Sequence, residues 1–90
     1  MDRAMVVSEV ATIVRRVAGP CRVIDATHEH TRLAEDCWLD SMELLELVLE
    51  CERHFGIAFE EATDLAPANL ATVGTLADVI RRRLSEKRSA

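Results

Sequence analysis

The chain has 90 residues, 49% of them apolar and 30% charged, and a net charge of −5. This length allows one domain, residues 1–90, with a modest core, and is too short for an enzyme with a deep cleft. The acidic balance disfavours nucleic acid as a partner. No apolar run approaches the roughly 20 residues of a membrane-spanning helix, and none follows a basic N-terminal segment.

The first predicted helix runs from about Met5 to Val17. Its apolar residues recur at the spacing of one helical face: Val6, Val10, Ile13, Val14 and Val17. Valine is a poor helix former in isolation, so this helix must rely on packing. Ala18-Gly19-Pro20 is expected to end it.

A long connection with little periodicity follows, from Cys21 to Leu39. A loop of this length in so small a domain is normally functional or pinned by buried anchors. The apolar residues that we expect to act as anchors are Val23, Ile24, Leu33 and Cys37. His28-Glu29-His30 suggests a metal site, but we interpret this alternation in a polar loop as solvated surface.

The three cysteines, Cys21, Cys37 and Cys51, include no Cys-x-x-Cys pair. An odd, unpaired set favours a reduced, cytoplasmic setting in which Cys37 and Cys51 are small buried hydrophobic residues. A zinc site that combines cysteines with His28 and His30 is disfavoured, because no two ligands have the usual spacing.

The stretch from Asp40 to Phe55 predicts a helix with three faces. Core-facing residues recur along one face: Leu44, Leu47, Val48, Cys51 and Phe55. A second apolar face consists of Met42, Leu45 and Leu49, and an acidic stripe of Glu43, Glu46 and Glu50 runs between the two. A small core cannot cover both apolar faces, so we expect this helix to bind a partner.

The charge of the chain is concentrated around this helix. Ten carboxylates and a single cation, Arg53, lie between Glu35 and Asp64. This asymmetry favours basic protein partners and disfavours nucleic acid.

Ser41 is left without a structural task at the start of the helix. Asp40 is the better N-cap, because it places Glu43 at the third helical position and completes a capping box, whereas a Ser41 cap would place Leu44 there. The Ser41 hydroxyl would then point outward from a first turn whose N–H groups and dipole favour a phosphate. The alternative is that Ser41 is itself the cap or a solvated serine.

Leu39-Asp40-Ser41-Met42, followed by an acidic amphipathic helix, resembles the signature of acyl carrier proteins. The resemblance extends to Leu33-Ala34-Glu35-Asp36 before the serine, Phe55 at the helix end and Thr72-Val73 further on. It implies that Ser41 carries a 4′-phosphopantetheine arm taken from coenzyme A. It also implies that Asp40 is part of what the phosphopantetheinyl transferase recognises.

Trp38 departs from the pattern of that family, which usually has glycine at this position. The indole could narrow the acyl group accepted, shield part of the arm, or pack on Leu39 and Met42. We favour the packing interpretation. The departure nevertheless favours a specialised carrier over a housekeeping one.

The segments after this helix predict two further elements. Gly56 supplies a left-handed cap, and an extended link then places Ile57 or Phe59 in the core. The segment from Glu61 to Leu70 permits only short helical turns.

The last helix begins at Thr72 as N-cap and carries one apolar face: Val73, Leu76, Val79, Ile80 and Leu84. Its cations, Arg81-Arg82-Arg83 and Lys87-Arg88, suit the negative end of the helix dipole, and we interpret them as solvated. A frayed tail is expected over 85–90. Together these elements predict an all-α fold, a small four-helix bundle with three longer helices, one short helix and a long first loop.

The resemblance implies a carrier without enzymatic activity, monomeric, that holds acyl groups as thioesters for enzymes of fatty acid, polyketide or related biosynthesis. Its second helix would bind basic patches on acyl-loading and acyl-processing enzymes through Met42, Glu43, Leu45, Glu46, Leu49, Glu50 and Glu52. An aminoacyl, D-alanyl or peptidyl carrier remains an alternative, as does an adaptor with an unmodified serine. A hydrolase is disfavoured, because His54 lies too far along the helix to activate Ser41.

Overall fold

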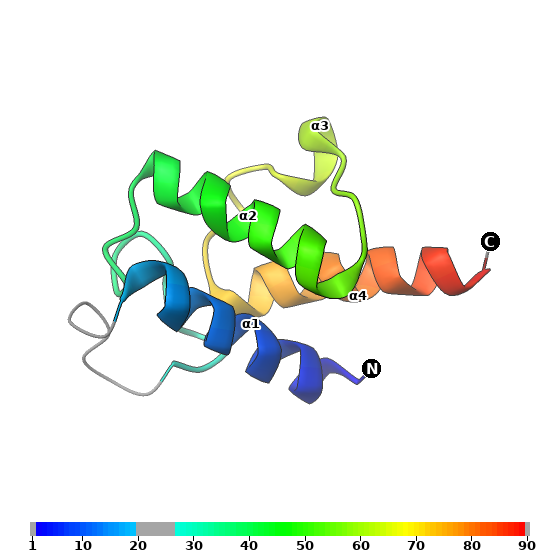
Figure 1. The fold of residues 1–90 in the computed structure, drawn as a ribbon, viewed down its shortest axis with the longest axis horizontal. Helices are drawn as coiled ribbons and strands as arrows, with labels where there is room; N and C mark the ends of the chain where they lie inside the picture. The colour runs from blue at the N-terminus through cyan, green and yellow to red at the C-terminus, as the bar shows by residue number, and fades with distance from the viewer. Residues whose placement is uncertain (1, 20–26, 90) are drawn as a thin grey trace.

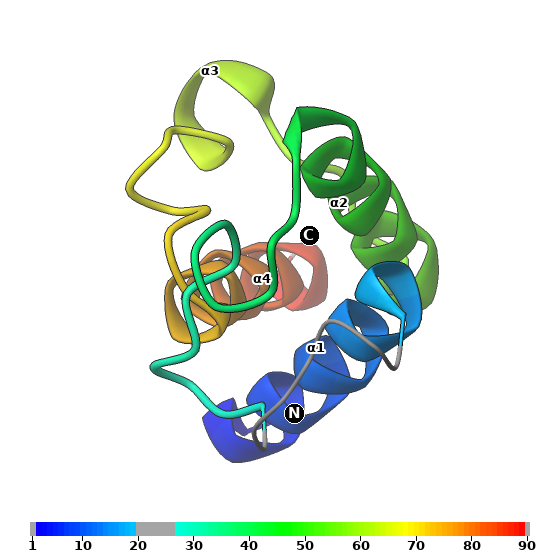
Figure 2. The same ribbon diagram turned by 90° about the vertical axis from the view of Figure 1, so that its left-hand side faces the viewer.

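The computed structural model describes residues 2–19 and 27–89, and the elements in that part of the chain are all helices. They are α1 (Arg3–Ala18), α2 (Ser41–Phe55), α3 (Glu61–Asp64) and α4 (Val73–Ser89). Figures 1 and 2 show the short α3 on the side of α2 and α4 that faces away from α1, and α1 packs against both long partners. The predicted bundle of three longer helices and one short helix is confirmed.

The first helix begins earlier than predicted because Asp2 caps it, accepting a hydrogen bond from the N–H of Met5. It ends at Ala18, where Gly19 has a φ of 83° and donates its N–H to the carbonyl of Arg15. The predicted apolar face is confirmed: Val6, Val10, Ile13 and Val14 are buried, and Val17 packs partly against the core.

The second helix contributes the face that the apolar spacing predicted. The buried residues are Leu47, Val48, Cys51 and Phe55, and Leu44 is half-buried against the core. Gly56 ends the helix with a φ of 64°, in the left-handed region. Beyond it, Ile57 and Phe59 are both partly buried against the core.

The connection before α2 is tied to the start of α4. The N–H of Leu33 donates to the carbonyl of Ala71 at 3.0 Å, and the N–H of Gly74 donates to the carbonyl of Glu29 at 2.8 Å. A Cβ at Gly74 would lie 2.8 Å from that same Glu29 oxygen. The close approach of the connection therefore requires glycine in the first turn of α4.

The anchors expected in this connection are confirmed where the structure describes them, because Leu33 and Cys37 are both fully buried. The other two, Val23 and Ile24, lie outside the described residues, as does Cys21. Leu39 joins the core as a further anchor just ahead of α2. The segment that leads into Ser41 is thus held from the inside.

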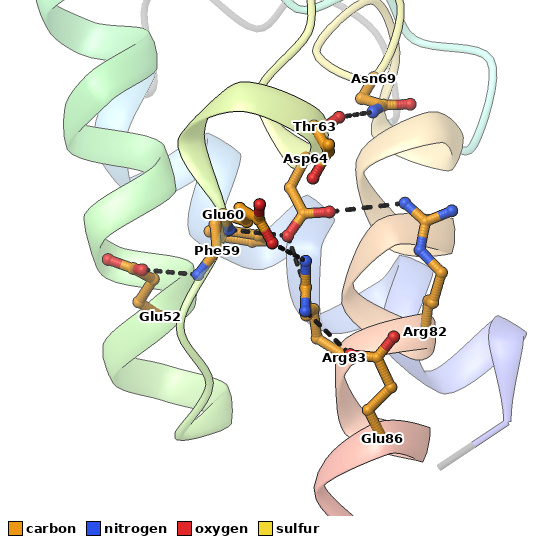
Figure 3. A network of polar contacts seen from close by, with 9 residues as sticks. All are labelled: Glu52, Phe59, Glu60, Thr63, Asp64, Asn69, Arg82, Arg83 and Glu86. Atoms are coloured by element: carbon orange, nitrogen blue, oxygen red, sulfur yellow. Dashed lines mark hydrogen bonds and ion pairs between the residues drawn. The ribbon is translucent and has the colours of Figure 1, made fainter.

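The junction of α3 with α4 contains a buried carboxylate, that of Asp64, which is 1% exposed. It accepts hydrogen bonds from the N–H of Glu60 at 2.8 Å and from Nε of Arg83 at 2.5 Å (Figure 3). Of the ten carboxylates counted between Glu35 and Asp64, that of Asp64 is therefore not available to a basic partner. The interpretation of the Arg81-Arg82-Arg83 run as solvated fails for Arg83, which turns inward to neutralise that carboxylate.

The last helix begins as predicted, since Oγ1 of Thr72 accepts a hydrogen bond from the N–H of Thr75 at 3.1 Å. Its apolar face is buried at Val73, Leu76, Val79 and Ile80 and half-buried at Leu84. The helix continues to Ser89, through the segment for which we predicted a frayed tail. One reason is that Nζ of Lys87 donates to the carbonyl of Gly56 at 2.7 Å, which ties the end of α4 to the end of α2.

Candidate functional site

The start of α2 is closed by a reciprocal capping box. The N–H of Glu43 donates to Oδ1 of Asp40 at 2.9 Å, and the N–H of Asp40 donates to Oε1 of Glu43 at 3.3 Å. Asp40 is thus the N-cap, as predicted, and Ser41 is the first helical residue. The alternative that Ser41 caps the helix is wrong.

The Ser41 side chain is exposed. Within the described part of the chain, no group forms a hydrogen bond with its hydroxyl. The hydroxyl stands at the N-terminal end of a helix of 15 residues, where the helix dipole favours a negatively charged group. A phosphodiester on this oxygen would displace no existing contact, so the residues present fit phosphopantetheine.

The chain ahead of Ser41 holds it in place through buried neighbours. The N–H of Leu39 donates to the carbonyl of Leu33 at 3.3 Å, and both side chains lie in the core. Asp36 closes the turn that lies ahead of Leu39, because its carboxylate accepts hydrogen bonds from the backbone N–H and the guanidinium of Arg32. These hydrogen bonds to Arg32 lower the pKa of Asp36. The serine thus follows a rigid segment.

Residues that could activate the hydroxyl are engaged elsewhere. Nε2 of His54 lies 2.9 Å from a carboxylate oxygen of Glu9 on α1, and Nδ1 of His28 accepts the N–H of His30. Among residues 2–19 and 27–89, no three side chains of metal-ligand type gather at one point. In the described residues, the Ser41 hydroxyl is therefore accessible and has no histidine placed to act as its general base.

The cysteines are poor nucleophiles where the structure describes them. Cys37 and Cys51 are buried, as expected. Burial raises the pKa of the Cys51 thiol to about 12 and also raises that of Cys37. Neither thiol is therefore suited to act as a thiolate at neutral pH.

The second apolar face of α2 is exposed to solvent. Met42 is 74% exposed and Leu45 is 50% exposed, and Leu49 follows them along the same face. Beside them, Glu46 is exposed and Glu43 is half-buried. The predicted surplus apolar face with an adjacent acidic stripe is thus present on this helix.

The acidic surface is narrower than the count of carboxylates suggested. Glu50 pairs with Arg53 at 3.0 Å, and Glu52 accepts the N–H of Phe59 at 2.8 Å (Figure 3). Arg32 pairs with both Glu35 and Asp36. The carboxylates free of such ion pairs in the described residues include Glu46, which lies among the exposed apolar side chains of α2.

Trp38 has a φ of 58°, and it is the one non-glycine residue in the described chain with a positive φ. This conformation costs a non-glycine residue roughly 1–2 kcal/mol, whereas glycine adopts it freely. The indole is 68% exposed, so the expected packing on Leu39 and Met42 leaves most of it in solvent. The glycine usual in the resembling family suits this backbone better than tryptophan does.

Within the described residues, none of the helices combines the length and the apolar character that crossing a bilayer requires.

Comparison with known proteins was consistent with this geometry. The family model described as "Phosphopantetheine attachment site" matches residues 8–82. The acyl carrier protein of Amoebophilus asiaticus (strain 5a2) is 42% identical over 55 residues, which cover 61% of this chain and 65% of that protein, just under two thirds of its length. The acyl carrier protein of Thermotoga maritima is 30% identical over 85 residues, covering 92% of this chain and 96% of that protein.

Proposed function

Because this chain belongs to the acyl carrier protein family, we propose that the Ser41 hydroxyl is the attachment point of its 4′-phosphopantetheine arm. Members of the family are carriers and not enzymes, and phosphopantetheine is their cofactor. The proposal concerns which residue bears the arm, what cargo it holds and which proteins the carrier meets. We also propose that residues 1–90 act as one carrier domain.

The observation that supports the proposal is that Asp40, and not Ser41, caps α2. Asp40 satisfies the N–H of Glu43 and closes the helix, which leaves the Ser41 hydroxyl exposed and without an internal partner in the described residues. A serine that capped the helix would have its oxygen occupied by a backbone N–H. Here that oxygen is accessible to an enzyme.

Within a transferase, the Ser41 oxygen would attack the diphosphate of coenzyme A. A phosphorus–oxygen bond forms to Oγ, the bond to the nucleotide half breaks, and the hydroxyl proton passes to a base of the transferase. When bound, the arm supplies a terminal thiol that holds an acyl group as a thioester. Asp40 keeps the first turn closed throughout, and its carboxylate is placed for recognition by the transferase.

Docking of partners would use the exposed face of α2. The residues that we propose for it are Met42, Glu43, Leu45, Glu46, Leu49, Glu50 and Glu52. The carboxylates would attract basic patches and raise association rates, and the apolar side chains would supply contact at the centre of the interface. Glu52 is expected to contribute least, because its carboxylate also accepts the N–H of Phe59.

The partners that we propose are a phosphopantetheinyl transferase and acyl-loading and acyl-processing enzymes of fatty acid, polyketide or related biosynthesis. A monomeric carrier in the cytoplasm fits this role. An aminoacyl, D-alanyl or peptidyl cargo is the second candidate, since the same thiol would hold either type of group as a thioester.

The experiment is intact-mass spectrometry after incubation with coenzyme A and a broad-specificity phosphopantetheinyl transferase. The wild type is expected to gain the mass of one phosphopantetheine group. Ser41→Ala should gain nothing and keep its helical circular dichroism. Ser8→Ala is the matched control, because Ser8 is an exposed serine on α1, and it should be modified like the wild type.

An unmodified wild type would favour the remaining alternative, a helical adaptor that binds a protein through α2. A gain of mass by Ser41→Ala would place the arm on another residue and would contradict the assignment.

A further inference from the structure

We propose that Trp38 is a contact residue for the transferase that modifies Ser41, and that this enzyme presents an apolar pocket bordered by basic side chains. The inference rests on the proposed attachment at Ser41. It adds a specificity-determining residue that lies outside α2, in the segment that leads into the helix.

Two features of Trp38 are unusual for a tryptophan. Its backbone has a φ of 58°, which a glycine would adopt more easily, and 68% of the residue is exposed. Core packing therefore gains little from the indole, while the backbone is strained by having a side chain at all. A binding role explains why a large aromatic residue stands here.

The backbone of Trp38 is held by its two neighbours. Cys37 and Leu39 are both buried, and their N–H groups donate to the carbonyls of Arg32 at 3.2 Å and Leu33 at 3.3 Å. The backbone on each side of Trp38 is therefore fixed, and binding would restrict little further backbone motion. An aromatic side chain on a backbone that is already ordered is favourable for binding, and tryptophan is enriched among the residues that dominate interface energies.

Trp38 lies close to Ser41 along the chain, within the area that an enzyme acting on Ser41 would contact. Three peptide units separate the two Cα atoms, so they are at most about 11 Å apart. A standard protein interface covers about 800 Å² on each partner, a patch about 30 Å across. A contact area of that size centred on the Ser41 oxygen extends about 15 Å in each direction, which is far enough to include Trp38.

The charges around Trp38 indicate which side chains should border the transferase pocket that receives the indole. Arg32 pairs with both carboxylates just before it, Glu35 and Asp36, at 2.5 Å and 3.0 Å. On the other side the acidic start of α2 follows, with the 74% exposed Met42 as the nearest apolar side chain along the helix. The complementary surface is therefore apolar opposite Trp38 and Met42, and basic where it faces α2.

The first test compares steady-state modification of the wild type and of Trp38→Gly. The probe is the phosphopantetheinyl transferase of the source organism that converts the wild type with coenzyme A. We expect the KM for the carrier to rise about tenfold and kcat to change less than about twofold, because the indole contributes to binding and not to chemistry. The helical circular dichroism should be unchanged and the melting temperature should not fall, since glycine suits the backbone.

Met5→Ala is the matched control. Met5 is also a large exposed apolar residue, but it belongs to the first turn of α1 (Arg3–Ala18), whose N-terminal end lies well away from the start of α2 (Figures 1 and 2). Its loss should leave the KM unchanged. If Trp38→Gly is modified with an unchanged or lower KM, the inference fails while the attachment at Ser41 stands. If the wild type is never modified, the proposed function fails first.

The second test observes the indole directly. Trp38 is the single tryptophan of the chain, so protein made with 5-fluorotryptophan gives one carrier ¹⁹F resonance. In the Ser41→Ala background no arm can be attached there, and addition of the transferase should shift the resonance and remove its solvent isotope shift. A resonance that does not respond although calorimetry shows binding would overturn the inference. So would a resonance that changes only on attachment of the arm to the wild type, because the arm would then be what covers the indole.

Discussion

Apolar side chains are usually buried and charged ones exposed. Two regions depart from this rule in opposite ways: the exposed face of α2 and the junction of α3 with α4. On α2, apolar side chains such as Met42 and Leu45 stand in solvent. At the junction, the Asp64 carboxylate is buried and paired with Arg83. Exposed apolar side chains add little to the stability of the isolated chain and remain available to partners. A buried ion pair fixes one local arrangement, and breaking it is expensive.

The charges at the junction show how the buried carboxylate is tolerated. The hydrogen bond from Arg83 is the main cause that lowers the pKa of Asp64, and the same bond raises the pKa of Arg83. Figure 3 shows Arg82 and Arg83 reaching from α4 toward Asp64, and Arg83 also pairs with Glu86. The short α3 is thus held to α4 largely by charge, whereas α1 and α2 pack mainly through apolar side chains, beside the contact of His54 with Glu9.

The largest effect should come from the two faces of α2. Leu47 is fully buried and Leu45 is 50% exposed, two residues apart on the same helix. Leu47→Ala is expected to lower the free energy of unfolding by about 3 kcal/mol, and Leu45→Ala by less than about 0.5 kcal/mol. Urea denaturation followed by circular dichroism measures both. Equal losses would mean that the second apolar face belongs to the core.

The next largest effect should come from the ion pair. Arg83→Ala leaves the Asp64 carboxylate buried without its main partner, and we expect a loss of about 2 kcal/mol in the free energy of unfolding. Arg81→Ala, an exposed arginine on the same helix, should change it by less than about 0.5 kcal/mol. If the two variants were equally stable, the junction would not depend on charge.

The capping box at the site should give an intermediate effect. Asp40→Ala removes the acceptor for the N–H of Glu43 and should lower the free energy of unfolding by about 1 kcal/mol. Asp40→Asn keeps a capping oxygen and should be nearly as stable as the wild type. If the transferase also modifies Asp40→Asn more slowly, it recognises the charge of Asp40 independently of the capping role of this residue. A large loss of stability in Asp40→Asn would contradict the capping account.

The smallest effect is expected in the pH dependence. Because the folded-state pKa of Asp64 is lowered, the pair contributes stability that is present above the unfolded-state pKa of about 3.9 and is lost as the pH falls through the folded-state pKa. The difference in melting temperature between the wild type and Asp64→Asn should therefore shrink between pH 6 and pH 2.5. A constant difference for Asp64→Asn would contradict the pairing.

Local periodicity and capping chemistry were enough to predict most of the fold and the position of Ser41. The faces of α2 follow from residues three and four apart, and its cap follows from Asp40 and Glu43. These features depend on contacts within one or two helical turns, which the order of residues determines directly.

The features that could not be predicted depend on contacts between distant segments. Arg83 reaches Asp64 across 19 positions, and no local pattern distinguishes this pair from the neighbouring solvated charges. Gly74 is required by the carbonyl of Glu29, a residue 45 positions earlier, and no local pattern indicates that contact. The positive φ of Trp38 was indicated by the glycine that is usual at this position in the family, whereas the 68% exposure of the residue depends on how the whole connection packs.

The most direct measurement is tandem mass spectrometry of the protein isolated from its native host. The account predicts that the phosphopantetheine mass appears on fragment ions that contain Ser41 and on no others. Native protein in which the peptide around Ser41 is never modified, or in which the arm is found on a different residue, would contradict it.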